Sequence, residues 1–460
     1  MKRNIKKQKI CVIGMGFVGA VSAIVFSNIS KNNKSKYNVI GIEKNDLEGK
    51  EKAKKLNDGI FISKTEDKNI NTYLKKSKKY RNFEVKLNFD DLRDADYVII
   101  AINLDLKGSI NSPNIDFSNL IKVSQIIGSK IKKSACIVVE TTVPPGTCDK
   151  IIMPTIKKKF KLRGINSNPN LIHSYERVTP GADYIKSIKS TSRIYSSSSN
   201  EAKNKFIKLY KDVIDLKNFS LVELDKFLDS ESAKILENSY RAINIAFLQE
   251  WTEFSLMNKL SINKILDAIK LRKTHNNIMR PGLGVGGYCL TKDPIFAYFS
   301  NKNFFKDRKN QFIISKSSMK INKQMPNFTF NIIKKILKNI KKPKIAIYGI
   351  TYKEGIGDLR FSPSLYLVKK LLKVGFDVDI YDPLVKKLPK SVNSKLNLNF
   401  DYNKYNLILF TVKNKLIEKF KFNKIFYRKN FYIIDTDKCL SENITKTLLK
   451  KKINFINFNA

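Results

Sequence analysis

Three glycines in the segment "GMGFVG" constrain this chain more than any other feature. They follow an apolar run, "KICVI", and the last of them lies within an apolar segment that we predict to be helical from 17 to about 27. Gly14 permits a tight turn, Gly16 lets the backbone approach a pyrophosphate, and Gly19 lets the helix pack closely on the strand. The pattern predicts a strand–turn–helix unit that binds a dinucleotide, and the alternative is a glycine-rich packing turn.

An acidic residue ends the next apolar segment, "NVIGIEKN", which predicts a second parallel strand. The carboxylate of Glu43 can accept hydrogen bonds from the hydroxyl groups of an adenosine ribose, and its charge repels a 2′-phosphate. The sequence therefore favours NAD over NADP as the cofactor.

Strand and helix signals alternate at both ends of the chain. The segments "ADYVIIAI" and "ACIVVETTVPPG" continue the first series, and "KPKIAIYG", "SPSLYLVKKLL", "FDVDIYDP", "YNLILFTV" and "NFYIIDTD" form a second one. This order predicts an α/β fold with two Rossmann-like, doubly wound parallel-sheet domains joined by a central helical segment. We expect an NAD-binding domain at 1–200, a central helical domain at 201–320 and a second Rossmann-like domain at 321–460. The second series lacks the glycine fingerprint, so we expect its first loop to bind a different anionic ligand.

The charge of the chain is strongly positive, with 87 Lys and Arg residues against 41 Asp and Glu residues and a net charge of +46. The lysines are scattered along the whole chain, which favours a solvated basic surface over a nucleic-acid-binding stripe. We therefore expect no nucleic-acid partner, although the positive field would attract an anionic cofactor or substrate.

The N-terminal segment has the basic and apolar regions of a signal peptide, but glycines interrupt the apolar run. It is also short of the roughly 20 residues that a membrane span needs, so we expect no membrane span. The five cysteines form no CxxC pair and have no histidine at zinc-site spacing. We therefore expect neither a disulfide framework nor a metal site, and a reducing cytoplasm is the simplest location for the protein.

One cysteine stands in an unusual setting, "GLGVGGYCLTKDP", where four glycines precede Cys289 and an ammonium and a carboxylate follow it. Taken alone, a small buried cysteine is the ordinary explanation. A predicted central helix also places Lys234, Asn238 and Arg241 on one face, and such a stripe alone would usually be solvent-exposed. The same helical segment, about 225–260, has apolar positions on more than one face, which predicts a two-fold interface.

Six segments together resemble the nucleotide-sugar 6-dehydrogenases in order and spacing, over nearly the whole chain. They are "GMGFVG", "TTVPPGT", "YERVTPG", "AKILENSYRAINIA", "GVGGYCLTKDP" and "YKEGIGDLRFSP". The resemblance implies an NAD domain, a central dimerisation region and a UDP-sugar domain, with the reaction in the cleft between the outer domains. The form of "YERVTPG" is most similar to the UDP-N-acetylhexosamine branch, whereas Pro180 stands where the UDP-glucose enzymes commonly have a second acid.

The resemblance also implies a four-electron oxidation of C6 of the sugar, in which Cys289 forms a thiohemiacetal and then a thioester. It places Lys234 and Asn238 around the reacting oxygen, Thr142 and Asp293 at the catalytic water, and Glu176 as a further acid or base. It implies cofactor contacts at Gly14, Gly16, Phe17, Val18, Gly19, Glu43, Thr142 and Lys292. It implies substrate contacts at Glu176, Arg177, Lys234, Asn238, Arg241, Gly286, Lys353 and Arg360.

The expected activity is therefore the NAD-dependent oxidation of a UDP-N-acetylhexosamine to its uronic acid, for polysaccharide biosynthesis, by a cytoplasmic homodimer. Three alternatives stay open at this point: a UDP-glucose 6-dehydrogenase, a one-step dehydrogenase that stops at the aldehyde, and a non-catalytic NAD-binding protein of the same fold. The number of NADH molecules formed per sugar separates catalysis in two steps from catalysis in one step and from none.

Overall fold

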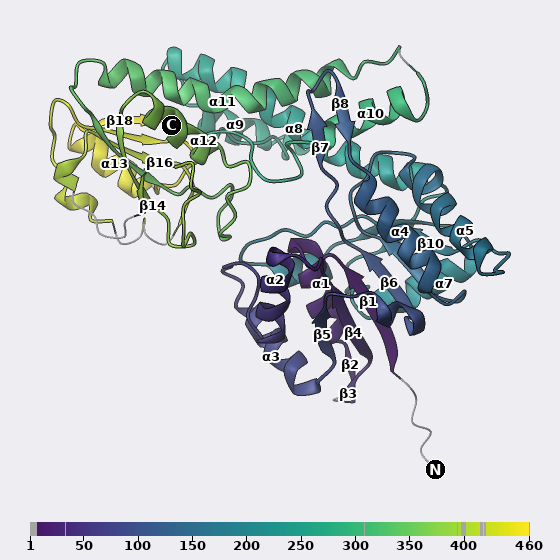
Figure 1. Ribbon diagram of the computed structural model, residues 1–460. Coiled ribbons are helices and arrows are strands. Elements are labelled where there is room, and N and C mark those ends of the chain that lie inside the picture. The colour runs from purple at the N-terminus through teal and green to yellow at the C-terminus, as the bar shows by residue number, and fades with distance from the viewer. Residues whose placement is uncertain are drawn as a thin grey trace. The chain divides into compact units, whose positions relative to one another are not determined.

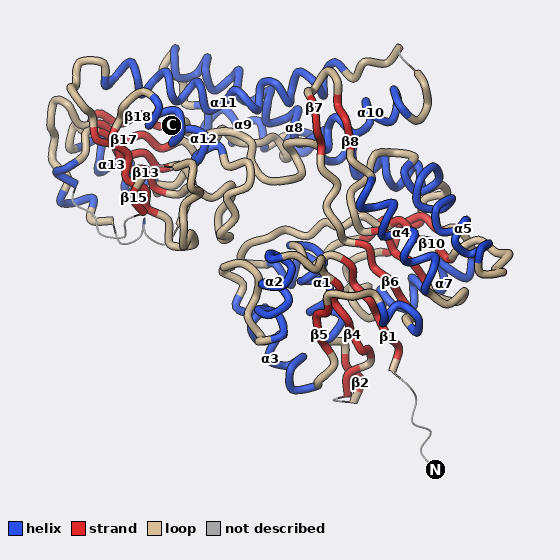
Figure 2. The backbone as a smooth tube through the Cα atoms, in the orientation of Figure 1, coloured by secondary structure: helices blue, strands red, loops and turns tan. Residues whose placement is uncertain are grey.

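The computed structural model describes residues 7–32, 34–307, 309–392, 394–396, 402–414, 417 and 420–459. The chain divides into two compact units. The first comprises Met1–Glu237 and Ile295–Gln311, and the second comprises Asn238–Pro294 and Phe312–Ala460. Each unit contains one large sheet, as Figures 1 and 2 show. The predicted α/β class with two Rossmann-like sheets is confirmed, and the three predicted domain boundaries stay predictions.

The sheet of the first unit has the strand order β12-β11-β10-β9-β6-β1-β4-β5. Its neighbours pair in parallel except β10 and β11, which run antiparallel. Because β1 lies inside the sheet between β4 and β6, its carboxyl end is flanked by strands on both sides, where doubly wound folds bind their ligands. The strands are β1 Gln8–Ile13, β4 Tyr37–Ile42, β5 Phe83–Lys86, β6 Tyr97–Ile100, β9 Cys136–Val139, β10 Asn170–His173, β11 Arg193–Ser197 and β12 Leu221–Glu223.

The helices of the first unit connect these strands, and α1 Phe17–Ser27 has the predicted bounds. Its residues from Gly19 onward are buried, because an almost entirely apolar helix packs against β1, β4 and α3. Two short antiparallel pairs lie outside the main sheet, β2 Ser30–Lys31 with β3 Lys34–Ser35 and β7 Leu106–Gly108 with β8 Pro113–Ile115. The other helices are α2 Leu47–Asn57, α3 Lys68–Tyr80, α4 Ser118–Lys130, α5 Met153–Leu162, α6 Tyr184–Lys189, α7 Asn200–Tyr210 and α10 Phe296–Asn303.

The longest helix is α8, Phe227–Met257, which the sequence predicts over about 225–260. Its first part belongs to the first unit, and its residues from Asn238 onward belong to the second. In the described part of the chain, none of the helices combines the length and the hydropathy that a bilayer crossing requires.

The sheet of the second unit is parallel throughout, in the order β15-β14-β13-β16-β17-β18. Successive residues of β13 face opposite sides, so that Ile345 and Ile347 pack into one hydrophobic cluster and Ala346 and Tyr348 into another. Residues of α11 and α12 complete the first cluster, and Leu448 of α13 completes the second. The elements are β13 Lys344–Tyr348, β14 Asp377–Tyr381, β15 Lys395–Leu396, β16 Leu407–Phe410, β17 Tyr432–Asp435, β18 Asn454–Asn457, α9 Ile262–Lys270, α11 Ile313–Leu337, α12 Pro363–Lys373 and α13 Glu442–Lys450.

Candidate active site

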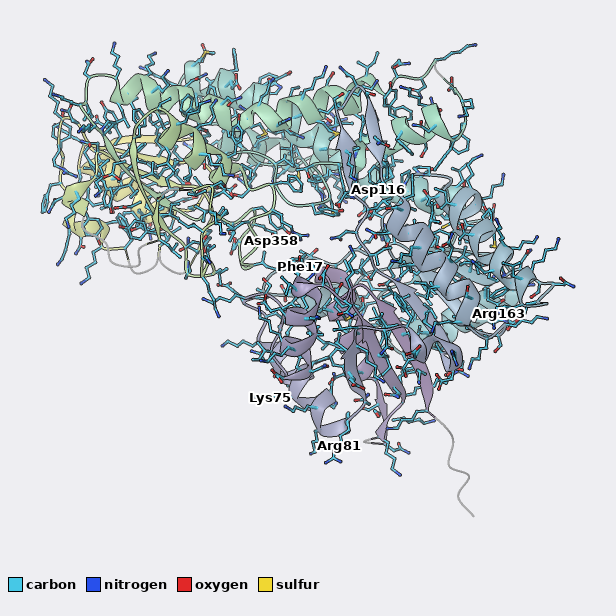
Figure 3. The ribbon with its side chains drawn as sticks, in the orientation of Figure 1. Phe17, Lys75, Arg81, Asp116, Arg163 and Asp358 are labelled. Carbon is cyan, nitrogen blue, oxygen red and sulfur yellow. The ribbon has the colours of Figure 1, made fainter. Side chains whose placement is uncertain are left out.

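The glycine loop of the first unit is a tight turn with one open side. Gly14 adopts a φ of +94°, and a Cβ there would lie 2.7 Å from the carbonyl oxygen of Ala101. A Cβ on Gly19 would lie 1.9 Å from the Gly14 carbonyl oxygen, whereas a Cβ on Gly16 would meet no heavy atom within 4 Å. Gly16 therefore faces open space where α1 begins at Phe17, labelled in Figure 3, and helix N-termini of this kind attract phosphate groups.

The Glu43 carboxylate is fixed beside this loop. Its Oε2 accepts a 2.9 Å hydrogen bond from the Met15 amide, its Oε1 accepts one of 2.9 Å from the Lys44 amide, and the Lys52 ammonium lies 3.9 Å from Oε2. An ionised carboxylate offers about four lone-pair sites, so it keeps the capacity to accept bonds from ribose hydroxyl groups. The open glycine turn and this placed acid fit the adenosine half of NAD.

Glu176 and Lys234, which the sequence analysis places in one catalytic group, meet in the first unit. The Lys234 ammonium donates a 2.9 Å hydrogen bond to the Glu176 carbonyl oxygen and lies 5.3 Å from the centre of the Tyr175 ring. The Glu176 carboxylate is buried, accepting from the Arg193 guanidinium at 2.5 Å and from the Arg177 amide at 2.9 Å. Arg193 was not among the predicted site residues.

The Arg177 side chain has partners that the sequence analysis did not identify. Its guanidinium pairs with Glu237 of α8 at 3.0 Å and donates to the Ser192 carbonyl oxygen at 2.9 Å. The pair with Glu237 joins the segment after β10 to α8, and the bond to Ser192 joins it to the residue before β11. Substrate contact by Arg177 stays a prediction.

A buried acid of α8 holds the loop that follows Thr142. Glu231 accepts hydrogen bonds from the Gly146 amide at 2.5 Å and from the Cys148 amide at 2.8 Å. Burial raises the pKa of Glu231 to about 7, although these two amide bonds oppose the rise. In the sequence Glu231 is an ordinary acidic residue of a predicted helix, one turn before Lys234, so nothing in the local pattern marks it.

In the second unit, the segment from Cys289 to Asp293 forms a turn that places Asp293 against Asn238 of α8. The Cys289 side chain is exposed, and its carbonyl oxygen accepts hydrogen bonds from the amides of Lys292 at 3.1 Å and Asp293 at 2.9 Å. The Asn238 amide group donates to Asp293 Oδ2 at 2.7 Å, and the Lys292 ammonium pairs with Oδ1 at 2.6 Å. A fully buried carboxylate with two fixed partners thus lies four residues from an exposed thiol.

The glycines before Cys289 serve packing within the second unit. A Cβ on Gly286 would lie 2.8 Å from both Pro363 Cδ and Tyr352 Cβ, and one on Gly287 would lie 2.7 Å from the Tyr352 ring. Gly287 also adopts a φ of +79°. The space that the missing side chain leaves at Gly286 is therefore filled by Tyr352 and Pro363, and substrate contact by Gly286 stays a prediction.

Two cations of the predicted substrate site lie near each other, and a third is paired. Burial and the positive charge of Arg241 lower the pKa of Lys353. The Lys353 ammonium and the Arg241 guanidinium are therefore close enough to repel each other. Such a pair suits an anionic ligand. Arg360 instead makes a forked pair with Asp358, labelled in Figure 3, at 2.8 to 3.1 Å, and lies 5.5 Å from the Tyr288 ring centre.

The structure thus brings together Glu176 with Lys234 in the first unit, and Asn238 with Asp293 and Lys292 in the second. Among the described residues, no group of three or more His, Cys, Asp or Glu side chains is arranged to hold a metal ion. The roles assigned to the individual site residues stay predictions.

Three domain models of one family match consecutive parts of the chain. An NAD binding domain matches residues 8–214, a central domain matches 229–324 and a UDP binding domain matches 346–442. The chain is therefore an NAD-dependent dehydrogenase of nucleotide sugars. It belongs to the UDP-glucose/GDP-mannose dehydrogenase family.

Individual relatives carry more specific names. A UDP-N-acetyl-D-mannosamine dehydrogenase of Campylobacter jejuni is 31% identical over 402 residues, covering 85% of this chain and 90% of the relative. One of Methanococcus vannielii is 30% identical over 451 residues, covering 96% and 95%. Among solved structures, a UDP-D-ManNAc dehydrogenase from Pyrococcus horikoshii covers 98% of this chain and 99% of its own, with a TM-score of 0.78 at 26% identity. A UDP-glucose dehydrogenase from Pyrobaculum islandicum, at 18% identity and a TM-score of 0.79, shares the fold.

Proposed function

We propose that the protein oxidises C6 of UDP-N-acetylmannosamine to the uronic acid in two successive NAD-dependent steps. The observation that carries the proposal is the exposed Cys289 thiol, four residues before a buried Asp293 carboxylate that Asn238 and Lys292 hold in place. A simple alcohol dehydrogenase has no use for such a thiol. The relatives named above support the N-acetylhexosamine substrate.

The proposed chemistry assigns a separate task to each group. The glycine loop and Glu43 would hold NAD, which would supply the hydride acceptor for each oxidation step. The Cys289 thiolate adds to the aldehyde carbon to form a thiohemiacetal, and loss of the second hydride from that carbon leaves a thioester. Water then adds to the thioester, so that the carbon–sulfur bond breaks, the uronate leaves and the thiol is restored.

The other proposed roles follow from what each side chain can donate or accept. Lys234 and Asn238 donate hydrogen bonds to the oxygen that becomes negative, and Asp293 and Thr142 orient the hydrolytic water. Glu176 is the further acid or base, although its carboxylate is turned toward Arg193 in this structure. Lys353 and Arg241 supply positive charge for the diphosphate of the substrate.

A panel of nucleotide sugars tests the proposal. With NAD present, we expect UDP-N-acetylmannosamine to give the highest kcat/KM, by about tenfold or more over UDP-glucose, because a site built around an acetamido group leaves polar groups unpaired without it. NADH absorbance and product analysis should show two NADH molecules per uronate. If UDP-glucose were the best substrate, the protein would be a UDP-glucose 6-dehydrogenase instead. One NADH per sugar would indicate a one-step dehydrogenase that stops at the aldehyde. Absence of turnover with every sugar would indicate a non-catalytic NAD-binding protein.

We further propose that the protein is a homodimer that associates through α8, in the reducing cytoplasm that suits its five free cysteines. An exposed apolar stripe supports this: Tyr240, Phe247, Trp251, Phe254 and Met257 are 46 to 73% exposed. The rings of Phe247, Trp251 and Phe254 contact one another edge to face along the helix. Large aromatic side chains left in water at helical spacing are typical of protein–protein interfaces.

Replacing Trp251 by glutamate should weaken this dimer. A central aromatic side chain of an interface typically contributes 2 kcal/mol or more, so we expect the dimer dissociation constant to rise about 30-fold or more. Light scattering over a dilution series measures it. Leu162→Glu is the matched control, because Leu162 is 72% exposed on α5 of the first unit. A wild-type monomer, or equal effects of both substitutions, would contradict the proposed interface.

A further inference from the structure

A cluster of charged side chains is buried in the first unit next to the segment that carries Glu176. The guanidinium of Arg193 contacts the carboxylates of Glu140 and Glu176, each at 2.5 Å, and the three side chains are at most 6% exposed. The Tyr210 hydroxyl donates to the same Glu140 oxygen at 2.5 Å, and the guanidinium lies 4.3 Å from the centre of the Tyr210 ring. None of these contacts was predicted from the sequence.

The topology of the sheet explains why these residues meet. Strands β10 and β11 run antiparallel, so the first residue of β11, Arg193, lies beside the chain that leaves the carboxyl end of β10 toward Glu176. Glu140 directly follows β9, the parallel neighbour of β10, two residues before Thr142. The Ser22 hydroxyl of α1 lies 3.3 Å from the second Glu140 oxygen. The cluster therefore joins the helix of the glycine loop, the strand before Thr142 and the segment of Glu176.

The Arg193 guanidinium grips the 174–176 segment at several points. Its Nε donates to the Ser174 hydroxyl at 3.0 Å, its Nη2 to the Ser174 carbonyl oxygen at 3.4 Å, and its Nη1 to Glu176. The carbonyl oxygen of the same Glu176 receives the Lys234 ammonium. Whatever fixes this short segment therefore also fixes the orientation of the Lys234 ammonium.

We propose that Arg193 is a positioning residue for Lys234, acting through the 174–176 segment, and that the charge of Glu140 sets how tightly Arg193 holds that segment. The proposal rests on the proposed function, because it takes Lys234 to act in the reaction. When Glu140 is ionised, one guanidinium is shared between two buried carboxylates. When Glu140 is neutral, Arg193 is committed to Glu176 and the Ser174 carbonyl oxygen.

The Glu140 carboxyl group changes its charge near neutral pH. Burial raises the pKa of Glu140 from its ordinary 4.5 to about 7, against the charge of Arg193 and the hydrogen bonds from Tyr210 and Ser22, and the charge of Glu176 adds to the rise. These four side chains are the ionisable and polar groups that face it from β11, α7, α1 and the segment after β10. The hold on Glu176 should therefore tighten as the pH falls through about 7.

Glu140→Gln separates the charge from the shape. The amide oxygen can accept the bonds from Arg193 and Tyr210 while the amide nitrogen faces Ser22, so we expect the fold to persist. In wild-type enzyme kcat should show an inflection near pH 7 that this variant lacks, with KM values for NAD and UDP-sugar within about threefold of wild type. A wild-type inflection that survives in Glu140→Gln would overturn the proposal.

Arg193→Lys keeps a positive charge but loses the fork that reaches two carboxylates at once. We expect kcat to fall by roughly tenfold or more with little change in KM, since small displacements of a catalytic group are costly, and the inflection to move to higher pH because the weaker contact stabilises ionised Glu140 less. A higher KM at unchanged kcat would show a binding role instead and overturn the proposal. Glu201→Gln is the matched control, because Glu201 is an exposed acid of α7 that pairs with Lys205; the inflection should persist in it.

A melting experiment reads the same ionisation without turnover. The folded chain holds the Glu140 proton up to about pH 7, whereas the unfolded chain releases it near 4.5, so this proton stabilises the fold at low pH and the contribution is lost as the pH rises. The melting temperature of wild type should therefore fall relative to Glu140→Gln between pH 4.5 and 7. A constant difference would overturn the assigned ionisation. If wild type oxidises another UDP-sugar, the proposed substrate fails, and the kinetic comparison is made with that sugar.

Discussion

Replacing Cys289 by alanine is expected to abolish the formation of uronate and of the second NADH. The reason is that an aldehyde C–H is a poor hydride donor until a nucleophile has added to the carbonyl carbon. Loss of the hydride then leaves a thioester, which is activated toward hydrolysis by water. Cys289→Ser should fail nearly as completely, because an alkoxide is far harder to generate near neutral pH than a thiolate. The measurement is the number of NADH and uronate molecules formed per sugar in single and multiple turnovers.

Two comparisons make the Cys289 result specific. NAD binding should stay near the wild-type level, because the glycine loop belongs to the first unit and Cys289 to the second. Cys439→Ala is the matched control, since Cys439 is a buried thiol of the second unit, and we expect its rate to stay within about twofold of wild type. Wild-type enzyme should release no aldehyde that hydroxylamine can trap. Undiminished formation of two NADH per sugar by Cys289→Ala would overturn the covalent mechanism.

The parts of the fold that follow from local patterns were predicted well. Helix α1 begins at Phe17 and ends at Ser27 as expected, because a glycine turn fixes its start and a continuous apolar run fixes its length. The central β13 and β16 of the second unit also fall on predicted segments, since strands buried on both faces are nearly all apolar. Asn238 and Asp293 are in contact, and their roles near the reacting groups stay predictions.

The features that escaped prediction depend on pairing between distant segments. Arg193 and Glu140 are single charged residues in unremarkable stretches, and they meet only because β11 runs antiparallel beside β10. A local signal exists for Glu140, which directly follows the apolar run "CIVV" of β9, where a buried charge needs a partner. The contacts of Gly286 and Gly287 also depend on a distant segment. Their sequence indicates close approach, but the approaching group is the Tyr352 side chain, from a segment more than sixty residues later.

Replacing Lys234 by alanine should lower kcat by roughly 10² or more, the usual effect of losing one donor to a developing oxyanion. The side chain is only 8% exposed, and one of its three N–H groups is committed to the Glu176 carbonyl oxygen, so the ammonium has two further donors in a fixed orientation. An ammonium held in this way loses little entropy when an oxyanion forms beside it. We therefore expect the loss to appear in kcat, with the KM for NAD nearly unchanged.

The matched control for this substitution is Lys264→Ala, because Lys264 is an exposed lysine of α9, and its removal tests whether loss of any positive charge slows the enzyme. With a net charge of +46, one lysine fewer should scarcely alter the field that attracts an anionic substrate, so Lys264→Ala should keep near wild-type kinetics. Lys234→Arg keeps the charge but replaces the compact ammonium by a planar fork, and it should recover only part of the lost rate. A decrease of less than about threefold in kcat for Lys234→Ala, with product still formed as uronate, would show that the oxyanion finds its donors elsewhere, for instance in the amide group of Asn238.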